Sequence, residues 1–408
     1  MSEYTDADLD VPHKKRCEAK DNLDPIFKDF PGYLKKKLAL HLFDLCDVYR
    51  GPVLNALRFY NCNAADANGG VSFCNAYCSV KPIKKKVFGT VFVAGLTTVS
   101  KFLKEGEIPD SIPERFVLSK LLHYMADEET QAILLNLEQY DETDLPIVLA
   151  NHLTGKLATS SRYVINKHLV KKKEKVRCPC SPDCDFTGVL GDTSIGNEEV
   201  WSGPLDIIVN QNVGVGVMEE DEENPSNQGL MIQNCSGLVK SDKLIAQTVV
   251  FSFLQKQIHP LSKHNLVPCF GVSSSGLVIY FYESEHDVLL ESSYIPFLAP
   301  TKSHSGVKVN LTAVLASWFA INCKYLCSGL PDSLKSEDKK ADFFTQANEK
   351  IGIYRNKLKL GDVGLPVQSS LVGDTVDSGE DSPDELDNIR FKLYKVAYRD
   401  KKCGEKCK

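Results

Sequence analysis

Hydrophobic residues in the first part of the chain recur at the spacing of a helix. Between residues 30 and 49 they stand three or four positions apart, which predicts an amphipathic helix. Further helical stretches are predicted at Lys84–Lys104, Glu114–Gln139 and Leu145–His168, separated by glycine and proline. The segment Asn61–Ser79 has no readable period. This part is therefore predicted to be a helical lobe.

The second part of the chain changes to short β-branched runs bounded by turn residues, which are typical of strands. A helix is predicted at Asp242–Ile258 and another at Leu311–Cys327. The turn Ser273–Gly276 is predicted to join two strands as a hairpin. The predicted strands are Leu205–Asn210, Val213–Met218, Pro268–Val272, Leu277–Glu283 and Val288–Ser292.

These patterns predict an α+β protein with a helical N-terminal lobe. Residues 1–24 and 366–389 are rich in charge and poor in large apolar groups, which predicts a disordered leader and a disordered acidic linker. The predicted divisions between and after them are a helical domain at 25–170, an α/β domain at 171–330, a helical extension at 331–365 and a basic tail at 390–408.

Composition narrows the cellular setting. The first residues are acidic where a secretory leader would be basic and apolar, and the apolar runs are too short to span a membrane. The 14 cysteines are therefore expected to be reduced thiols in the cytoplasm or nucleus. The net charge of −6 means that any contact with nucleic acid requires a local basic patch.

A carboxylate inside a predicted buried strand is the first sign of chemistry. Asp206 stands within the apolar run 205–209, where desolvation of its charge calls for a compensating cation. The next strand ends in Glu219 and Glu220, and an antiparallel pairing would bring one of them to the same end of the sheet. Two such carboxylates suit Mg²⁺. Alternatively, Asp206 caps a turn and the glutamates belong to a solvated acidic run.

The predicted helix Asp242–Ile258 adds two polar side chains to this end of the sheet. Lys243 and Gln247 lead an apolar stripe at helical spacing. Gln247 is a candidate for orienting water or phosphate and Lys243 for stabilising developing charge. Gln247 would otherwise satisfy a buried backbone group.

The order of these parts resembles the PD-(D/E)XK nuclease superfamily over about a quarter of the chain. Residues 201–206 look like the glycine-containing entry to the strand with the catalytic aspartate, and Asp242–Gln257 looks like the following helix. Glu198 or Glu199 is a match for the acid that precedes the core. The resemblance implies a restriction-endonuclease-like mixed sheet flanked by helices within residues 171–330.

The resemblance also implies a function and a departure from it. Asp206 with Glu219 or Glu220 would hold Mg²⁺ for hydrolysis of a phosphodiester in nucleic acid, assisted by Lys243 and Gln247. No lysine follows either glutamate at the spacing of the family motif, so Lys243 would have to replace it. The expectation is a metal-dependent nuclease, active or lapsed. The alternative is a catalytically inactive scaffold that binds a partner through its helical lobe or acidic tail.

Three cysteines within seven residues are a second candidate site. Cys178, Cys180 and Cys184 would need a fourth ligand to hold a structural zinc, and the candidates are His168, Cys74 and Cys78. The alternative is a surface loop with free thiols. Basic clusters that could contact a phosphate backbone lie at Lys35–Lys37, Lys84–Lys86 and Lys171–Lys173, although each is also compatible with a solvated surface.

Overall fold

The computed structural model describes residues 24–66, 69–160, 162–169, 177–181, 183–184, 186–218, 242–262, 264–301 and 306–361. The predicted acidic linker and basic tail, the predicted leader apart from Asp24, and the cluster Lys171–Lys173 lie outside these residues. So do Glu219 and Glu220.

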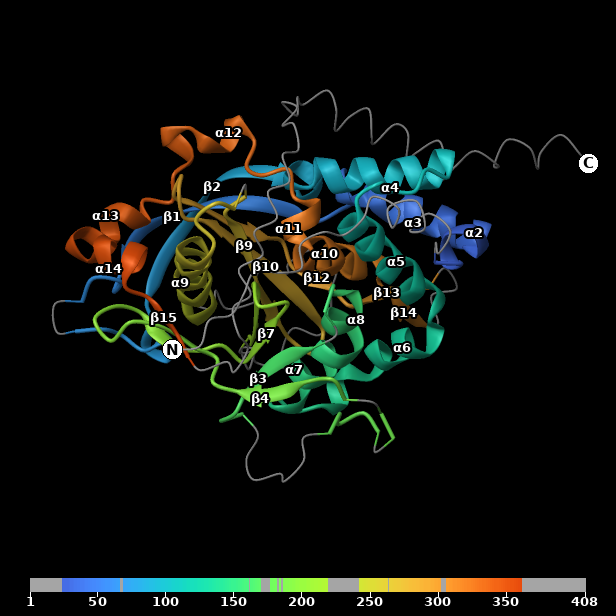
Figure 1. The fold of residues 1–408 in the computed structure, drawn as a ribbon. Helices are drawn as coiled ribbons and strands as arrows, with labels where there is room; N and C mark the ends of the chain where they lie inside the picture. Colours follow the sequence, from blue (N-terminus) through green and yellow to red (C-terminus); the bar gives the residue numbers. More distant parts are fainter. Residues whose placement is uncertain are drawn as a thin grey trace, which may run out of the picture.

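A ten-stranded mixed sheet crosses the molecule, with helices on both of its faces (Figure 1). The strand order is β2-β1-β11-β10-β9-β8-β7-β3-β4, and β12 pairs with β10. Neighbours are antiparallel except β8–β9 and β3–β4. The strands are β1 (Val53–Cys62), β2 (Cys78–Val87), β3 (Tyr163–Asn166), β4 (Val189–Gly191), β7 (Ile207–Val209), β8 (Val213–Val217), β9 (Leu266–Val272), β10 (Gly276–Glu283), β11 (Val288–Ser292) and β12 (Ile295–Pro296).

Two small sheets accompany the large one. One is an antiparallel pair of β13 (Leu298–Pro300) and β14 (Val307–Val309). The other has the order β15-β5-β6, and it joins β5 (Ser194–Gly196) and β6 (Ser202–Pro204) to β15 (Lys359–Leu360) near the end of the described chain.

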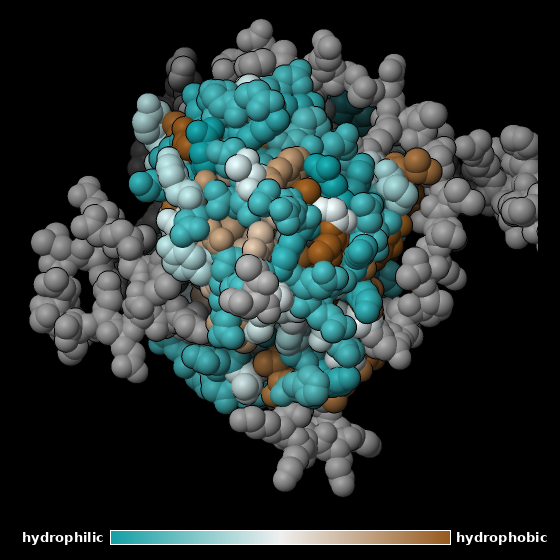
Figure 2. Space-filling view, turned by 90° about the vertical axis from the view of Figure 1, so that its left-hand side faces the viewer, coloured by the Kyte–Doolittle hydropathy of each residue, from teal (hydrophilic) through white to brown (hydrophobic). Residues whose placement is uncertain are grey.

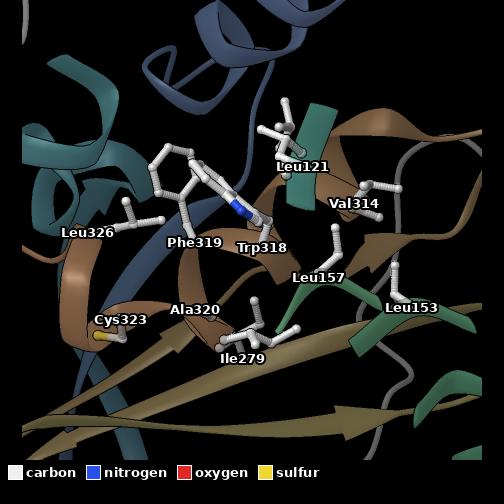
Figure 3. Packing of buried hydrophobic residues seen from close by; sticks show 14 of the residues in the cluster. Leu121, Leu153, Leu157, Ile279, Val314, Trp318, Phe319, Ala320, Cys323 and Leu326 are labelled. Carbon is white, nitrogen blue, oxygen red and sulfur yellow. The ribbon is translucent and has the colours of Figure 1, made fainter. Parts of the chain in front are cut away.

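Most of the N-terminal helices pack with α10 on one face of the large sheet. All residues of α10 are buried, and Trp318 Nε1 donates a hydrogen bond to the Val117 carbonyl at 3.0 Å. Figure 3 shows Trp318 among leucines from the neighbouring helices, above Ile279 of β10. The helices around this core are α2 (Ile26–Asp29), α3 (Gly32–Leu45), η2 (Phe88–Val91), α4 (Val93–Glu105), α5 (Ile112–Ala126), α6 (Glu128–Ile133), η3 (Leu134–Gln139), α7 (Asp144–Leu149), η4 (Ala150–Thr154), α8 (Gly155–Leu157), α10 (Leu311–Ile321) and α11 (Cys323–Leu326).

The other face of the sheet carries α9 and the C-terminal helices. Phe343 lies 5.1 Å from Tyr354 and 5.6 Å from Trp201 between ring centroids, so this layer has an aromatic core. Its outer surface is mostly hydrophilic, with hydrophobic residues in small groups (Figure 2). The helices of this side and its loops are η1 (Phe73–Asn75), α9 (Asp242–Ile258), η6 (Glu337–Lys339), α13 (Phe343–Ala347), η7 (Asn348–Lys350) and α14 (Ile351–Asn356). The short helix α12 (Asp332–Lys335) instead buries Leu334 in the core that contains α10.

The predicted α+β class with a helical N-terminal region is confirmed, as are the helix at Asp242–Ile258 and the hairpin of β9 and β10. The helix predicted from Lys84 is wrong at its start, because residues 84–87 belong to β2 and the helix begins at Val93. Strand β1 was not predicted. Half of β1 is buried, including the neighbouring pairs Val53–Leu54 and Ala56–Leu57, so it lacks the polar alternation of a half-exposed strand.

Candidate functional site

Asp206 lies at the start of β7 and is buried, with 7% of its surface exposed. The register of β7 and β8 pairs Ile207 with Val215, which places residue 216 opposite residue 206. The backbone carbonyl of Asp206 accepts a hydrogen bond from Asn166 N–H at 2.9 Å, so β3 fixes its position. Its side-chain Oδ2 accepts a hydrogen bond from Val217 N–H, also at 2.9 Å. The carboxylate is therefore held within the sheet.

Helix α9 brings Lys243 to the Asp206 carboxylate and places Gln247 near the same point of the sheet. Lys243 Nζ lies 3.5 Å from Asp206 Oδ2, and the Lys243 side chain is 29% exposed. Gln247 is fully buried and donates from Nε2 to the Pro204 carbonyl at 3.0 Å. Its Oε1 has no hydrogen-bond partner among the described residues. The Gln247 amide thus satisfies a buried backbone group, the structural role weighed for it, and keeps one free acceptor.

Gly216 lets helix α9 approach the sheet at this point. A Cβ at this position would lie 2.8 Å from Leu244 Cδ2, 3.2 Å from Gln247 Oε1 and 3.5 Å from Asp206 Oδ2. A side chain would thus collide with the helix, because carbon atoms are in contact at about 3.5–4.0 Å. Position 216 faces Asp206 and has no room for a carboxylate.

The acids predicted to precede the core form no metal-binding group with Asp206 among the described residues. Glu198 and Glu199 are exposed in the turn between β5 and β6. Among the described residues a single group of three or more His, Cys, Asp or Glu side chains is close enough to hold a metal ion, and Asp206 is not in it. Within these ranges, Asp206 has one ammonium and one backbone N–H as partners.

The single group of potential metal ligands consists of His152, Cys178, Cys180 and Cys184, whose ligand atoms all lie within 4.8 Å of one another. His152 Nε2 is 3.2 Å from Cys178 Sγ, 3.1 Å from Cys180 Sγ and 3.4 Å from Cys184 Sγ. Ligands of a tetrahedral zinc with bonds of about 2.0–2.3 Å stand only slightly farther apart. The four side chains can therefore hold a metal ion.

The surroundings of this cluster suit bound thiolates. Asn151 Nδ2 donates a hydrogen bond to Cys184 Sγ at 3.3 Å, and Tyr163 O–H donates to Asn151 Oδ1 at 3.1 Å. Such outer contacts orient ligands and tune a metal site. Burial raises the pKa of all three cysteine thiols and lowers the pKa of His152. A bound cation would offset this desolvation of the thiolates.

The sequence missed His152 as the fourth ligand. None of His168, Cys74 and Cys78, the three candidates proposed for that place, belongs to the group. His152 lies in η4, a single π-helical turn between α7 and α8, 26 residues before Cys178. π-helical turns frequently mark functional sites. The local sequence carries no metal-binding spacing, so only the fold brings His152 to the cysteines.

The basic cluster Lys84–Lys86 lies on β2, the edge strand of the large sheet. No carboxylate of the described residues forms an ion pair with these lysines. Nearby, Lys81 Nζ lies 4.7 Å from the ring centroid of Tyr60, whose surface is 54% exposed. Lysines also protect a sheet edge from pairing with another chain. This edge is therefore compatible either with contact to a phosphate backbone or with protection of the sheet.

Comparison with protein-family models, curated proteins and solved structures found no match to this chain. The described helices also include none with the length and apolar character that crossing a lipid bilayer requires. The site geometry therefore carries the functional argument.

Proposed function

We propose that this chain is a non-hydrolytic interaction protein built on a nuclease-like core, with a nucleic-acid backbone as its partner. The observation that carries the proposal is the pairing of Asp206 with Lys243 and with Val217 N–H. Both contacts are made to Oδ2, so a metal at that oxygen would have to displace this ammonium. Position 216, which faces Asp206, has no room for an acid. Among the described residues, Asp206 belongs to no group of three or more potential metal ligands.

The resemblance to PD-(D/E)XK nucleases supports the nuclease-like part of the proposal. Strand β7, antiparallel β8, helix α9 and parallel β9 follow one another as that resemblance implies. In this arrangement Lys243 sits beside the aspartate instead of on the strand. It neutralises the Asp206 charge in the resting structure.

The β2 edge supports the partner class. Lys84, Lys85 and Lys86 are adjacent, unpaired among the described residues, and followed along the edge by the Lys81–Tyr60 contact. Lysines that neutralise phosphates release counterions, and exposed aromatic rings stack on unpaired bases. A single-stranded nucleic acid fits this combination.

The cleavage test uses single- and double-stranded DNA and RNA with Mg²⁺ or Mn²⁺. The wild-type chain is expected to cleave no faster than Asp206→Asn, with Asp192→Asn as a control at a half-buried acid outside the site. The proposal of a silent core fails if cleavage requires the metal and disappears in Asp206→Asn while the fold is retained.

The binding test measures fluorescence anisotropy of labelled single strands at several salt concentrations. Lys84→Glu with Lys85→Glu is expected to weaken binding by at least tenfold at low salt and to reduce its salt dependence. The matched control reverses the charges of Lys101 and Lys104, which form ion pairs with Glu107 and Glu105 on another surface. If both pairs of substitutions weaken binding equally, the β2 lysines are not a nucleic-acid site and serve only to protect the sheet edge from pairing.

A metal-dependent nuclease is the second candidate, favoured by one observation. Asp206, Lys243 and Gln247 converge, and Gln247 keeps a buried acceptor beside the carboxylate. Glu219 and Glu220, the remaining predicted Mg²⁺ ligands, would have to complete the site. Loss of cleavage in both Asp206→Asn and the pair Glu219→Gln with Glu220→Gln would establish it.

We also propose that the metal of the cysteine cluster is zinc. Three thiolates and one imidazole form a soft, four-coordinate set that leaves no open position, which is typical of structural zinc. Elemental analysis of the purified chain is expected to find one zinc per molecule. Cys180→Ser with Cys184→Ser should lose it, and Cys74→Ser, an exposed thiol outside the cluster, should keep it.

A further inference from the structure

Strands β3 and β4 are parallel neighbours joined by an unusual connection. The chain leaves β3 at Asn166 and enters β4 at Val189. Parallel neighbours need such a crossover of a dozen or more residues, and it is usually an α-helix packed on the sheet. The described residues of this connection, 167–169, 177–181, 183–184 and 186–188, contain no helix.

All three cysteines of the metal-binding group stand in this crossover. Cys178 is buried, whereas Cys180 and Cys184 are half-buried against the main core. The remaining apolar contact of the described crossover is sparse, for example Phe186, whose ring meets Tyr163 edge-on at 5.9 Å. Among the described residues of the crossover, attachment to the core thus comes from these thiols and from the apolar side chains of Leu169 and Phe186.

The fourth ligand belongs to a rigid part of the molecule. Next to His152 in η4, Leu153 is buried in the core that contains Ile279 and Val314 (Figure 3). On its other side, Asn151 is hydrogen-bonded to Tyr163 of β3. His152 is therefore an anchor whose position does not depend on the crossover.

We infer that the zinc is a clip that fastens the described part of the β3–β4 connection to η4 and thereby holds β4 on the sheet. This inference rests on the proposed zinc site. Metal-ligand bonds replace an apolar interface here, as they do in small domains that cannot build a sufficient core.

Strand β4 is the element that depends on the clip. It is a three-residue edge strand that pairs with β3 alone, and Val189 and Leu190 are 46% and 43% exposed. Beyond the strand pairing, Lys167 N–H donates to the Gly191 carbonyl at 2.9 Å. So short an edge strand has little stability of its own.

Hydrogen exchange with mass spectrometry on the full chain tests the clip, with zinc content measured on the same samples. In the Cys180→Ser and Cys184→Ser double variant, and after chelation of the wild type, exchange in residues 186–191 is expected to rise about tenfold or more. Residues of β9 and β10 should be unchanged, and Cys74→Ser should match the wild type. Added zinc should restore protection in the chelated wild type.

The outcomes separate the clip from the zinc site itself. If zinc is present and its removal leaves exchange in residues 186–191 unchanged, the clip is refuted and the zinc site stands. If the wild type binds no zinc, the proposed zinc site is refuted as well. Faster exchange throughout the sheet would overturn the local role and make the metal a requirement of the whole fold.

Discussion

At the scale of single residues, Asp206 and Lys243 form a largely buried ion pair between the sheet and helix α9. Removing one partner of such a pair leaves the other charge desolvated, and this costs more than the pair contributes. The same helix carries a second pair, Lys256 with Glu285 at 3.2 Å, whose side chains are 34% and 56% exposed. The two pairs permit a controlled comparison.

Lys243→Met is expected to lower the free energy of unfolding by about 1–3 kcal/mol, because the Asp206 carboxylate keeps only its hydrogen bond from Val217. Lys256→Met should cost less than about 1 kcal/mol, since exposed ion pairs contribute little. Urea denaturation of both variants measures the difference. Equal effects would show that the Asp206 pair is no more important than a surface pair.

The absence of a side chain at position 216 makes a second prediction. Gly216→Ala should lower the free energy of unfolding by about 1–3 kcal/mol, because the new methyl group overpacks the contact with buried Leu244. Gly352→Ala is the control, as its Cβ would meet no atom within 4 Å in helix α14. Thermal unfolding should leave that control unchanged or slightly stabilised. A neutral Gly216→Ala would indicate space beside Asp206.

At the scale of elements, helix α3 carries two neighbouring groups whose titrations oppose each other. Burial lowers the pKa of His41 from 6.5 to about 4, with help from Lys308 and Lys37. Burial also raises the pKa of Asp44 from 3.8 to about 6. His41 Nδ1 lies 3.6 Å from Asp44 Oδ2 and 3.0 Å from Thr312 Oγ1 of α10. Burial thus favours the neutral form of each group.

The two groups are expected to give opposite pH dependence of stability. The contribution of His41 is present above pH 6.5 and is lost as the pH falls toward 4, because the unfolded chain binds the proton more readily. The contribution of Asp44 is present below pH 3.8 and is lost as the pH rises through 6. Unfolding by urea between pH 4 and 7 measures both.

Single variants should reveal how each group changes the pH dependence of the free energy of unfolding relative to the wild type. Asp44→Asn is expected to lose stability more steeply on acidification below pH 6.5, since the His41 term is no longer opposed. His41→Gln should gain stability relative to the wild type between pH 6 and 4, because the Asp44 term remains. Parallel curves for all three proteins would contradict both assignments.

At the scale of the whole molecule, Phe343 connects the C-terminal segment to the sheet. Its ring contacts Phe59 of β1, Phe253 of α9 and Tyr282 of β10, at 5.6–6.0 Å between centroids. The neighbouring Phe344 is half-buried and lies under Arg355, whose Cζ is 4.7 Å from the ring centroid. Residues 341–358 therefore belong to the core of the described structure and not to its surface alone.

Phe343→Ala is expected to destabilise the protein by about 3–5 kcal/mol, the usual cost of removing a buried aromatic ring. Phe344→Ala should cost markedly less, because much of its ring faces Arg355 and solvent. Chemical denaturation measures the free energy of unfolding of the two variants. Similar losses would mean that the C-terminal segment is attached by its outer contacts.

The sequence alone determined the elements whose signals are local. The period of three to four predicted most of the helical stretches, and the run of short β-branched segments predicted the strands after residue 200. The helix predicted at Leu145–His168 is wrong at its end, because α8 ends at Leu157 and Tyr163–Asn166 form β3. Asp206, Lys243 and Gln247 were predicted together because a hairpin followed by a crossover helix has restricted geometry. Strands β1 and β2 carry no local pattern of this kind. Half of β1 is buried without a regular polar alternation, and β2 is a lysine-rich edge strand.

Only the tertiary structure decided which distant residues meet. His152 joins Cys178, Cys180 and Cys184 because η4 and the crossover fold onto the same face, a contact that no spacing encodes. Likewise, the close packing of α9 over Gly216 leaves no room for a side chain opposite Asp206, whose Oδ2 pairs with the Lys243 ammonium. Local propensity fixes the elements, whereas a site depends on side chains that packing brings together from far along the chain.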